Sequence, residues 1–510
     1  MINLFRRLFP KTKTRLVRVR AKYDAAQTTY DNQRHWAAAD DLSAKSANNA
    51  HVRRQLRKRS RYEISNNSYA RGIVSTLANY TIGSGPTPGI TYLGNMLERQ
   101  DVSELSAVVM RLFHEWWQEA EIQNKLATAG ETVPRDGEAF FTKYTSANPF
   151  WRSPVRLNVR LLEADQFETD NLQGQLGSDE SGVELDQNGD IMAYYLLPYH
   201  PGDTFSPIQS AIRISARDVY HLYRADRPGQ LRGIPWLTPS LNIFAQLRRF
   251  VLATLTAAET AADHAAVLEQ MAGADDEDQA EPWERMEIER GAMVTLPAGA
   301  KLSQFKAEHP NATFEQFITS MVREAARCVD MPAVLAIDAS KYNYASGRLD
   351  LQAFWRTRGA ERVLIYERQF LDPLWRDWLD EALLIPGYLP DLFAETAYDW
   401  APLWRWSEAE HVDRAKEAAG QAAELANHTT TLAREYARRG LDWEDELKQR
   451  ARELELMREL GLTAAQAQPQ PQTQPQPQPI EQPEEIEDSP EDEIEDDLED
   501  SVEDSPDEQV

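Results

Sequence analysis

Helical and strand-like spacings of apolar residues follow one another through the first half of the chain. Between Asp101 and Ala120 apolar residues recur every three or four positions, which predicts an amphipathic helix. Residues 182–198 indicate two strands around Asn188-Gly189, a dipeptide that favours tight hairpin turns. The second arm, Ile191 to Leu197, is apolar on both faces, so we expect it to be covered on both sides. With a further strand at Val219–Tyr223, the pattern predicts an α+β lobe.

Two long helices dominate the pattern after Pro235. Apolar residues keep a three-to-four spacing from Leu241 onward, which predicts a helix that ends near Met271 and is about 45 Å long. Residues 292–305 are typical of strands about a Pro-Ala-Gly turn. A second helix is predicted from Thr313 to Met331-Pro332, where proline ends it. The pattern therefore predicts two rods joined at one end by a small αβ module.

The C-terminal region changes composition abruptly. Residues 467–479 are almost entirely Gln and Pro, a composition of extended, solvated backbone, so the ordered part is expected to end near Leu462. Residues 480–510 carry 17 Asp and Glu and neither Lys nor Arg. Of the net charge of -27, residues 1–62 contribute +12 and residues 63–479 contribute -22. An acidic body argues against tight binding to a phosphate backbone, although DNA can still pass such a surface without sticking.

The single cysteine and the distribution of charges point to a reducing compartment. Cys328 cannot form an internal disulfide, and its place beside the apolar stripe of the second helix indicates packing rather than nucleophilic chemistry. Charged residues interrupt the most apolar window, 243–262, so no membrane span is expected. The first nine residues lack the apolar run of a secretory signal.

Signatures of catalysis or metal binding are weak throughout the sequence. There is no phosphate-binding loop, and Gly83-Ser84-Gly85 is interpreted as a turn. His114-Glu115 is not followed by a second histidine, and the nine histidines never pair at metal-ligand spacing. We therefore predict no catalytic residue, no metal, no cofactor and no enzymatic activity. The thirteen tryptophans are interpreted as core and interface residues because few cations accompany them.

Two charged features leave more than one interpretation. Asp136-Gly137-Glu138 and Glu163 with Asp165 place carboxylates close together, but neither group brings the further residues that would define a mechanism, and a solvated loop is favoured. The basic cluster Arg53 to Arg61 is either a solvated helix face or a contact for nucleic acid or an acidic protein. The sequence does not choose between these two interpretations of the cluster.

Several long motifs together resemble the lambda-type portal proteins of tailed bacteriophages, over about residues 53–462. The most specific stretches are GVELDQNGDIMAYYLLPYHPGD (182–203) and ISARDVYHLYRADRPGQLRGIPWLTPSL (214–241). DASKYNYASGRLDLQAFWR (338–356) resembles the Asn-Tyr-Ser-Ser-x-Arg motif of the family, with Ala345 where the first Ser is usual. Other stretches that resemble the family are RSRYEISNNSYARGIVSTLANYTIGSGP (59–86), HEWWQEAEI (114–122), RDGEAFF (135–141), LLEADQFETD (161–170) and ERGAMVTLPAGAKLSQFKAEHPNATFEQF (289–317).

The resemblance implies a portal-type α+β subunit with a mixed wing, two stem helices, a small αβ clip, a helical crown and a disordered tail. The implied segments are a basic start at 1–62, the wing at 63–235, stem helix 1 at 236–271, the clip at 272–312, stem helix 2 at 313–336, a tunnel loop at 337–347, a tunnel-backing helix and return to the wing at 348–400, the crown at 401–462 and the tail at 463–510.

The resemblance also implies a function and partners. Such subunits form a homo-oligomeric ring, usually a dodecamer, at one capsid vertex, and double-stranded DNA passes through its channel during packaging and ejection. The implied partners are the terminase large subunit, the major capsid and scaffold proteins and the head-tail connector proteins, with no membrane. The implied location is the virion, and the host cytoplasm during assembly. The rival interpretations are a capsid-associated adaptor without a channel and a capsid-associated nuclease or protease.

The tunnel loop supplies the candidate functional residues. It is short, polar and aromatic, so a cation could meet passing phosphates and aromatic rings could press on the duplex. A plain helix-to-helix connector is the alternative. The candidates are Lys341, Tyr342, Asn343, Tyr344, Ser346 and Arg348.

Overall fold

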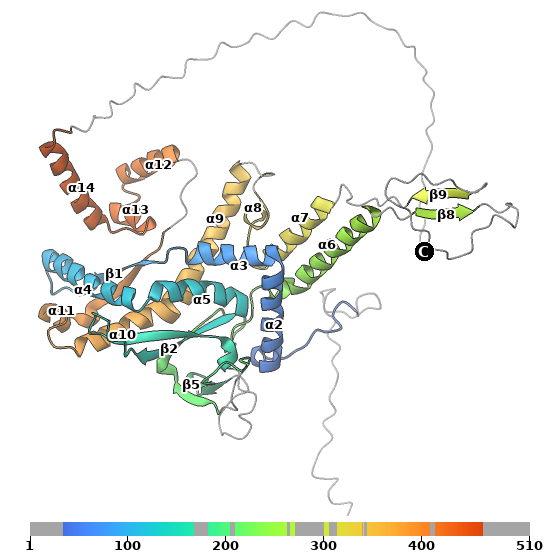
Figure 1. Cartoon of the computed structure of the whole chain (residues 1–510). Coiled ribbons are helices and arrows are strands. Elements are labelled where there is room, and N and C mark those ends of the chain that lie inside the picture. Colours follow the sequence, from blue (N-terminus) through green and yellow to red (C-terminus); the bar gives the residue numbers. More distant parts are fainter. Residues whose placement is uncertain are drawn as a thin grey trace, which may run out of the picture. The chain divides into compact units, whose positions relative to one another are not determined.

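The computed structural model describes residues 34–167, 182–204, 210–262, 266–270, 300–304, 314–338, 340, 344–407 and 414–462. The chain divides after Glu444 into two units. The first unit contains the sheets and the helices up to α13, and the second contains most of α14 (Trp443–Glu459). Figure 1 shows the order of the elements along the chain.

Four helices open the first unit: α2 (Ala50–Asn66), α3 (Ser68–Thr81), α4 (Arg99–Glu119) and α5 (Ile122–Asp136), preceded by the single turn α1 (Ala44–Ala47). Asn67 separates α2 from α3, and its side chain accepts hydrogen bonds from the first backbone N–H groups of α3. In α4 the predicted apolar stripe is buried, which confirms the helix expected between residues 101 and 120.

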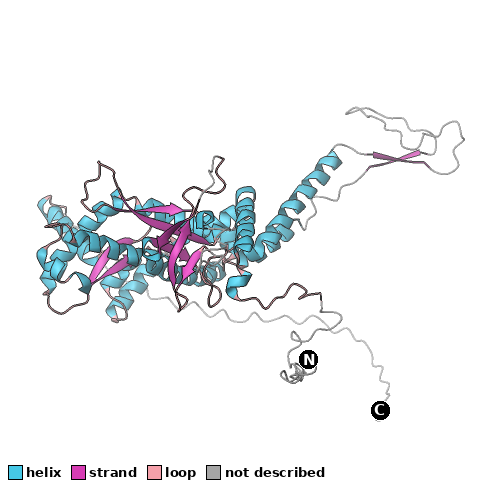
Figure 2. Cartoon of the chain, turned by 90° about the horizontal axis from the view of Figure 1, so that it is seen from below, coloured by secondary structure: helices cyan, strands magenta, loops and turns pink. Residues whose placement is uncertain are grey.

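The described residues of this unit include two three-stranded antiparallel sheets. Figure 2 shows the strands in magenta among the helices in cyan. The first has the order β3-β2-β7 and the second the order β4-β5-β6. Short 3-10 turns η3 (Ala164–Phe167) and η4 (Ala216–Asp218) lead into or out of these strands. The strands are β2 (Glu138–Thr145), β3 (Leu157–Leu162), β4 (Val183–Leu185), β5 (Ile191–Leu196), β6 (Ile212–Ser215) and β7 (Val219–Tyr223).

The predicted hairpin and the predicted strand at residues 219–223 are both confirmed. Strand β4 pairs antiparallel with β5, and Gly189 takes φ of 92°, a conformation that glycine adopts without steric cost. The expectation that both faces of the second arm are covered holds for Ala193, Tyr194 and Tyr195, which are buried. It is wrong for Met192, which is 51% exposed because β5 is covered on that face only at its centre.

Aromatic side chains form the centre of the main core. Phe113 of α4 is fully buried and contacts Trp116, Trp375, Trp378 and Trp404, with ring centroids 5.0 to 6.4 Å apart. These rings come from α4, from α10 (Asp372–Leu383) and from β10 (Trp400–Arg405). The interpretation of these tryptophans as core residues is confirmed.

Strand β10 corrects the expectation that residues 401–462 are helical from their start. It pairs antiparallel with β1 (Thr87–Tyr92) in a two-stranded sheet. The strand forms because Trp400 and Trp404 point to the same buried side while the intervening backbone completes hydrogen bonds with β1. It follows α11 (Asp391–Glu395) and the turn η7 (Ala397–Asp399), and the helices after it are α12 (Arg414–Ala426), α13 (Leu432–Arg438) and α14.

The first rod is shorter than predicted. A 3-10 turn, η5 (Thr238–Ser240), precedes α6 (Leu241–Ala262), so the helix has 22 residues and rises about 33 Å. Residues 266–270, expected to continue this helix, form strand β8 (Ala266–Gln270) and pair antiparallel with β9 (Ala300–Gln304). The sequence Ala-Val-Leu-Glu-Gln of residues 266–270 fits a helix or a strand, and the backbone pairing with β9 selects the strand. The other residues expected to form strands, 292–299 and 305, lie outside the described residues.

The second rod, α7 (Phe314–Arg327), is confirmed and packs antiparallel to α6. Leu247 of α6 and Ile318 and Val322 of α7 form a small core between the two helices. Cys328 follows α7, is half-buried against the main core, and its thiol donates a hydrogen bond to the Ala325 carbonyl. Burial raises the pKa of this thiol, which agrees with a packing role.

A continuous helical segment follows the short helix α8 (Ala333–Ala336). It begins as α9 (Tyr344–Glu361), widens into the π-helix η6 (Arg362–Leu371) and ends as α10. The helix was expected to begin near Arg348, and it begins one turn earlier. Within the described residues, no helix is both long enough and apolar enough to cross a bilayer.

Candidate functional site

The cations of the basic cluster divide between two faces of α2. Arg53, Arg57 and Arg61 are spaced four residues apart and therefore lie on one helix face. The side chains of Arg53 and Arg57 are only 1% exposed. The other cations of the cluster are on the exposed side of the helix: Arg54, Lys58 and Arg59. Half of the cluster therefore faces the protein interior.

Glu138, at the start of β2, is fully buried and is the centre of a network of charged groups that includes Arg57 of this face. Arg232 binds both of its oxygens, with Nε to Oε2 at 2.9 Å and Nη2 to Oε1 at 2.7 Å. His221 Nε2 lies 3.0 Å from Oε2, and the backbone N–H of Gly233 donates to the same oxygen at 2.9 Å. Arg57 Nη1 is 3.6 Å from Oε1. One carboxylate thus joins α2, β2, β7 and the segment before α6.

The charges at Glu138 keep it ionised. Burial alone would raise the pKa of Glu138. The charge of Arg232 and the hydrogen bond from His221 lower the pKa by more than burial raises it, so it lies well below its usual value. Burial lowers the pKa of His221 in spite of the nearby carboxylate. Neutral His221 then donates from Nε2 to Glu138, while its Nδ1 lies 3.3 Å from the Tyr194 hydroxyl.

Two glycines, Gly137 and Gly233, allow Glu138 and Arg232 to lie close together. Gly137 ends α5 with φ of 92° and turns the chain directly into β2. A Cβ on Gly137 would overlap the backbone of Ile234, and a Cβ on Gly233 would overlap the Gly137 carbonyl. The two backbones can therefore touch only because both positions are glycine, and this contact places Glu138 beside Arg232.

A second group of ion pairs extends the network toward the surface. Arg61 binds Asp136 through Nε to Oδ1 at 2.8 Å and Nη2 to Oδ2 at 2.9 Å. The same guanidinium reaches Asp165 Oδ2 at 2.7 Å, and Arg57 Nη2 lies 3.4 Å from Asp165 Oδ1. Burial alone would raise the pKa of Asp165, but Arg57 and Arg61 lower it below its usual value. The inward arginines of α2 thus hold α5 and the segment after β3.

The interpretation of these acids as solvated loop residues is wrong. Asp136 and Glu138 are fully buried, and the Asp165 side chain is 14% exposed; only Glu163, at 52%, remains largely in solvent. The acids come from segments far apart in the sequence, so their convergence on α2 is a tertiary effect. In the sequence, the four-residue spacing of Arg53, Arg57 and Arg61 is the pattern that could have indicated a helix face with buried acidic partners.

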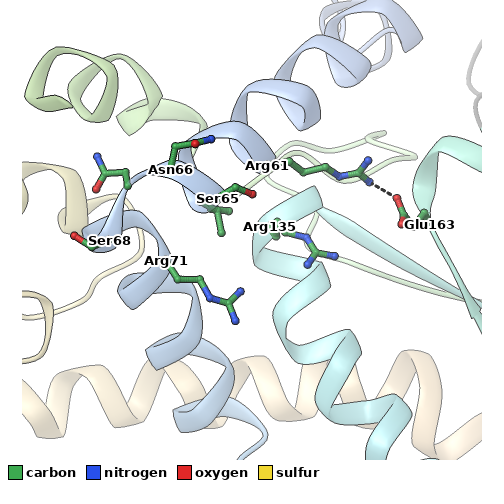
Figure 3. Close-up of a pocket in the computed structure, with 9 residues that line it drawn as sticks. Arg61, Ser65, Asn66, Ser68, Arg71, Arg135 and Glu163 are labelled. Atoms are coloured by element: carbon green, nitrogen blue, oxygen red, sulfur yellow. Dashed lines mark ion pairs between the residues drawn. The ribbon is translucent and has the colours of Figure 1, made fainter. Parts of the chain in front are cut away.

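A polar cavity of about 910 Å³ opens beside this network, where α2 meets α3. Figure 3 shows Arg61 directed toward Glu163, while Arg71 of α3 and Arg135 of α5 border the same space. Arg71 pairs with Glu131 at 3.0 Å. Among the described lining residues, Ile64 is the sole aliphatic side chain, so this part of the lining suits water or small anions better than an apolar substrate.

One group of residues could supply metal ligands. Glu163, Asp165 and His200 each offer one ligand atom, and these atoms lie within 4.8 Å of one another. Arg61 Nη2 already lies 3.0 Å from Glu163 and 2.7 Å from Asp165. A cation would have to displace this guanidinium, so the arrangement favours the ion pair. Sequence spacing missed His200 because it lies 35 residues beyond Asp165.

The predicted tunnel-loop residues fall at the start of α9. Lys341, Tyr342 and Asn343 lie outside the described residues. Tyr344 is the first residue of α9, and Arg348 follows one turn later in the same helix. Ser346 and Arg348 are exposed. The structure therefore brings three of the six candidates together on one helix end.

The opposite end of α9 is fixed by two buried arginines. Arg358 Nη1 binds Glu361 Oε2 at 2.7 Å, and the guanidinium lies over the rings of Phe354 and Trp236. Burial raises the pKa of Glu361 to about 7, although Arg358 opposes the shift. Arg362 donates to the Thr81 carbonyl at 2.7 Å and to the Tyr80 carbonyl at 3.1 Å, which satisfies the C-terminal end of α3.

The family model described as "Phage portal protein, lambda family" matches residues 31–362. This range includes the buried network, α6, α7, the candidate loop and α9. The chain belongs to the lambda family of phage portal proteins. A "Probable portal protein" of Halomonas phage phiHAP-1 is 25% identical over 438 residues, which cover 80% of this chain and 81% of that protein.

Solved structures with some likeness to this portal subunit come from gene transfer agent particles. A chain of the "Neck of empty GTA particle computed with C6 symmetry" has a TM-score of 0.39 and 11% identity, covering 74% of this chain and 91% of that one. A chain of the "Neck of native GTA particle computed with C12 symmetry" has a TM-score of 0.36 and 12% identity, covering 72% and 87%. The identification rests on the family match.

Replacing Glu138 with Gln is expected to lower the free energy of unfolding of the portal subunit by about 3 to 5 kcal/mol. The reason is that the buried guanidinium of Arg232 loses the negative charge that balances it. Arg57 loses one of the two carboxylates near it. Urea unfolding followed by circular dichroism measures the change. Glu184→Gln is the matched control, because its partner Arg213 is 52% exposed and only a small loss is expected. Equal losses in the two variants would contradict a dominant role for the network.

Glu361 is expected to make stability fall as pH rises from about pH 4.5 to pH 7. Its folded-state pKa of about 7 lies above the ordinary value of 4.5, so in this range the folded state binds a proton that the unfolded state does not. The contribution is about 1 to 3 kcal/mol. Urea titrations from pH 5 to pH 8 should show a smaller decline for Glu361→Gln than for the parent. Parallel pH profiles would contradict the assignment.

Proposed function

We propose that the chain assembles into a closed ring at one capsid vertex, and that the central channel carries double-stranded DNA during packaging and ejection. The observation that carries this proposal is the family match over residues 31–362. The resemblance of the sequence to the family further implies a dodecamer. In this proposal the terminase large subunit docks on the ring first and head-tail connector proteins later, while the major capsid and scaffold proteins surround it.

The arrangement of helices suits this role. The antiparallel pair α6 and α7 extends from the lobe that holds the sheets, as Figures 1 and 2 show, and corresponds to the proposed stem. The pair β8 and β9 follows α6 in the chain and belongs to the proposed clip. Helix α9 then carries the proposed tunnel loop at its start, and at its end Arg358 contacts Trp236 and the Val329 carbonyl while Arg362 donates to the Thr81 carbonyl.

The charge of the chain also suits a channel. DNA that must slide cannot be held by many cations, because each phosphate neutralised by Lys or Arg adds affinity through counterion release. Residues 63–479 have a net charge of -22, and two inward arginines of α2, Arg57 and Arg61, pair with buried or largely buried acids. A few cations at one constriction, such as Lys341 and Arg348, can then contact the phosphates without holding the duplex.

An enzymatic role is not favoured. The carboxylates that a nuclease would need are engaged by arginines: Glu138 by Arg232, and Asp136 and Asp165 by Arg61. We propose a structural role in the virion, with assembly in the host cytoplasm. An adaptor that never forms a channel remains distinguishable by its stoichiometry.

Purified full-length protein is expected to form closed rings with an axial hole. Native mass spectrometry should give a single large multiple of the subunit mass of 58.1 kDa, and negative-stain images should show the hole. Monomers at micromolar concentration in both low and high salt would contradict the ring, and small open oligomers would favour the adaptor.

Replacing Lys341, Tyr342 and Asn343 by Gly and Ser is expected to leave ring assembly and incorporation into procapsids intact. The amount of DNA packaged or retained should fall, because the loop would no longer contact the duplex. Packaged DNA can be measured by nuclease protection followed by gel electrophoresis. The control is the same replacement in the exposed turn at residues 201–203. Full-length genomes retained as well as in the parent would refute the constriction at this loop.

A further inference from the structure

The polar cavity beside α2 is bordered by cations from three helices. Arg61 of α2, Arg71 of α3 and Arg135 of α5 line it, and Figure 3 shows their side chains around one space. Among the described residues of the lining, Glu163 supplies the sole carboxylate. The wall of the cavity therefore carries an excess of positive charge, which attracts anions.

Arg135 has hydrogen-bonding capacity that its protein partners do not use. A guanidinium group has five N–H donors in fixed directions. Within the described part of the chain, Arg135 donates one hydrogen bond, from Nη2 to the Thr132 hydroxyl at 3.3 Å. Its Nε lies 3.4 Å from Asp136 Oδ1 without a hydrogen bond, and Asp136 is already bound by Arg61. The Arg135 side chain is 28% exposed, so a ligand in the cavity can reach its remaining donors.

The start of α3 brings further donors to the same cavity. Ser65 and Ser68 line it and are exposed, so their hydroxyl groups can donate to a ligand. Ser68 is the first residue of this 14-residue helix, and the positive end of the helix dipole therefore lies at the cavity. Helix starts attract anions in many proteins, and here three guanidinium groups accompany one.

We propose that this cavity is a binding site for a phosphate group. A phosphate presents its oxygens in several directions, so donors on three different helices can reach different oxygens, whereas a carboxylate presents two oxygens in one plane. The planar fork of arginine also matches the geometry of phosphate. With a volume of about 910 Å³, the cavity can admit a phosphate that is part of a larger molecule.

Two sources present this chemistry: inorganic phosphate, and a phosphate group of a nucleic acid. The proposal does not depend on the ring, because all the residues that carry it belong to one subunit.

Glu163 competes with the ligand for Arg61. Glu163 Oε2 lies 3.0 Å from Arg61 Nη2, and the glutamate side chain is 52% exposed, so it can turn toward solvent when an anion enters. Arg61 meanwhile keeps its two hydrogen bonds to the buried Asp136 and stays in place. The carboxylate of Glu163 therefore limits the affinity for phosphate, because it both occupies Arg61 and repels an anion.

Titration calorimetry of the full-length chain with inorganic phosphate at low ionic strength tests the site. The parent should bind phosphate saturably. Arg135→Gln should weaken the affinity about tenfold, since it removes a charged donor with few other partners. Arg71→Gln should weaken it less, because Glu131 already pairs with Arg71 at 3.0 Å.

The matched control is Arg213→Gln. Arg213, like Arg71, is 52% exposed and pairs with one glutamate, but it lies in β6 and does not line the cavity. The control variant should bind phosphate as the parent does. A loss of affinity in Arg213→Gln equal to that in Arg135→Gln would overturn the site, because it would show that only the total charge matters.

Glu163→Gln provides a gain of binding that a folding defect cannot imitate. It removes the competing carboxylate, so phosphate should bind at least about twofold more tightly than to the parent. Phosphate affinity that is unchanged or lower in Glu163→Gln would contradict the arrangement proposed for this cavity.

A short single-stranded oligonucleotide, followed by fluorescence anisotropy, separates the two sources. If nucleic acid supplies the phosphate, the oligonucleotide should bind more tightly than inorganic phosphate, and Arg135→Gln and Glu163→Gln should shift its affinity in opposite directions. If inorganic phosphate is the ligand, these opposite shifts should appear in calorimetry alone. The proposal fails if neither ligand binds the parent, or if neither affinity depends on these two residues.

Discussion

The ion pair between Glu138 and Arg232 is the interaction on which the rest of the first unit depends. A carboxylate that is completely buried loses its hydration, and it stays ionised only because Arg232, His221 and a backbone N–H surround it. Its partners come from the last strand of the main sheet and from the segment that leads into α6. Arg57 of α2 approaches the same carboxylate and so connects a third element to it. The starting point of α6 is thereby fixed to the sheet of the lobe.

The same principle recurs at the base of α9. Arg358 and Arg362 lie one turn apart and bind, respectively, an acid of the same helix and the carbonyls at the end of α3. Buried guanidinium groups make these connections because they donate several hydrogen bonds in fixed directions and do not lose their charge. Arg362 thus ties one end of α9 to α3, while the proposed DNA-contacting residues lie at its other end.

The charged residues of the subunit therefore differ between its interior and its surface. Inside, arginines and carboxylates neutralise one another and set the geometry. Outside, acids predominate, and the chain as a whole carries -27. The cavity beside α2 and the acidic group that includes His200 lie where these two regions meet, and Arg61 contacts both. Arg61 therefore holds the fold and also pairs with two of the three potential metal-ligating side chains.

Local patterns in the sequence were sufficient for much of the fold and for the family. The stripe of α4, the hairpin turn at Gly189 and the strand at 219–223 depend on neighbours in the chain, so spacing and turn chemistry predicted them. Long motifs identified the portal family, whereas the candidate loop they implied stays a prediction, with Tyr344, Ser346 and Arg348 lying inside α9. Tertiary structure alone decided where partners distant in sequence meet. It buried Asp136 and Glu138 against arginines 75 to 94 residues away, ended α6 at Ala262 and turned residues 400–405 into a strand. Charge and hydropathy at one position do not determine burial, because the free energy of a buried ion depends on a partner that only the folded chain supplies.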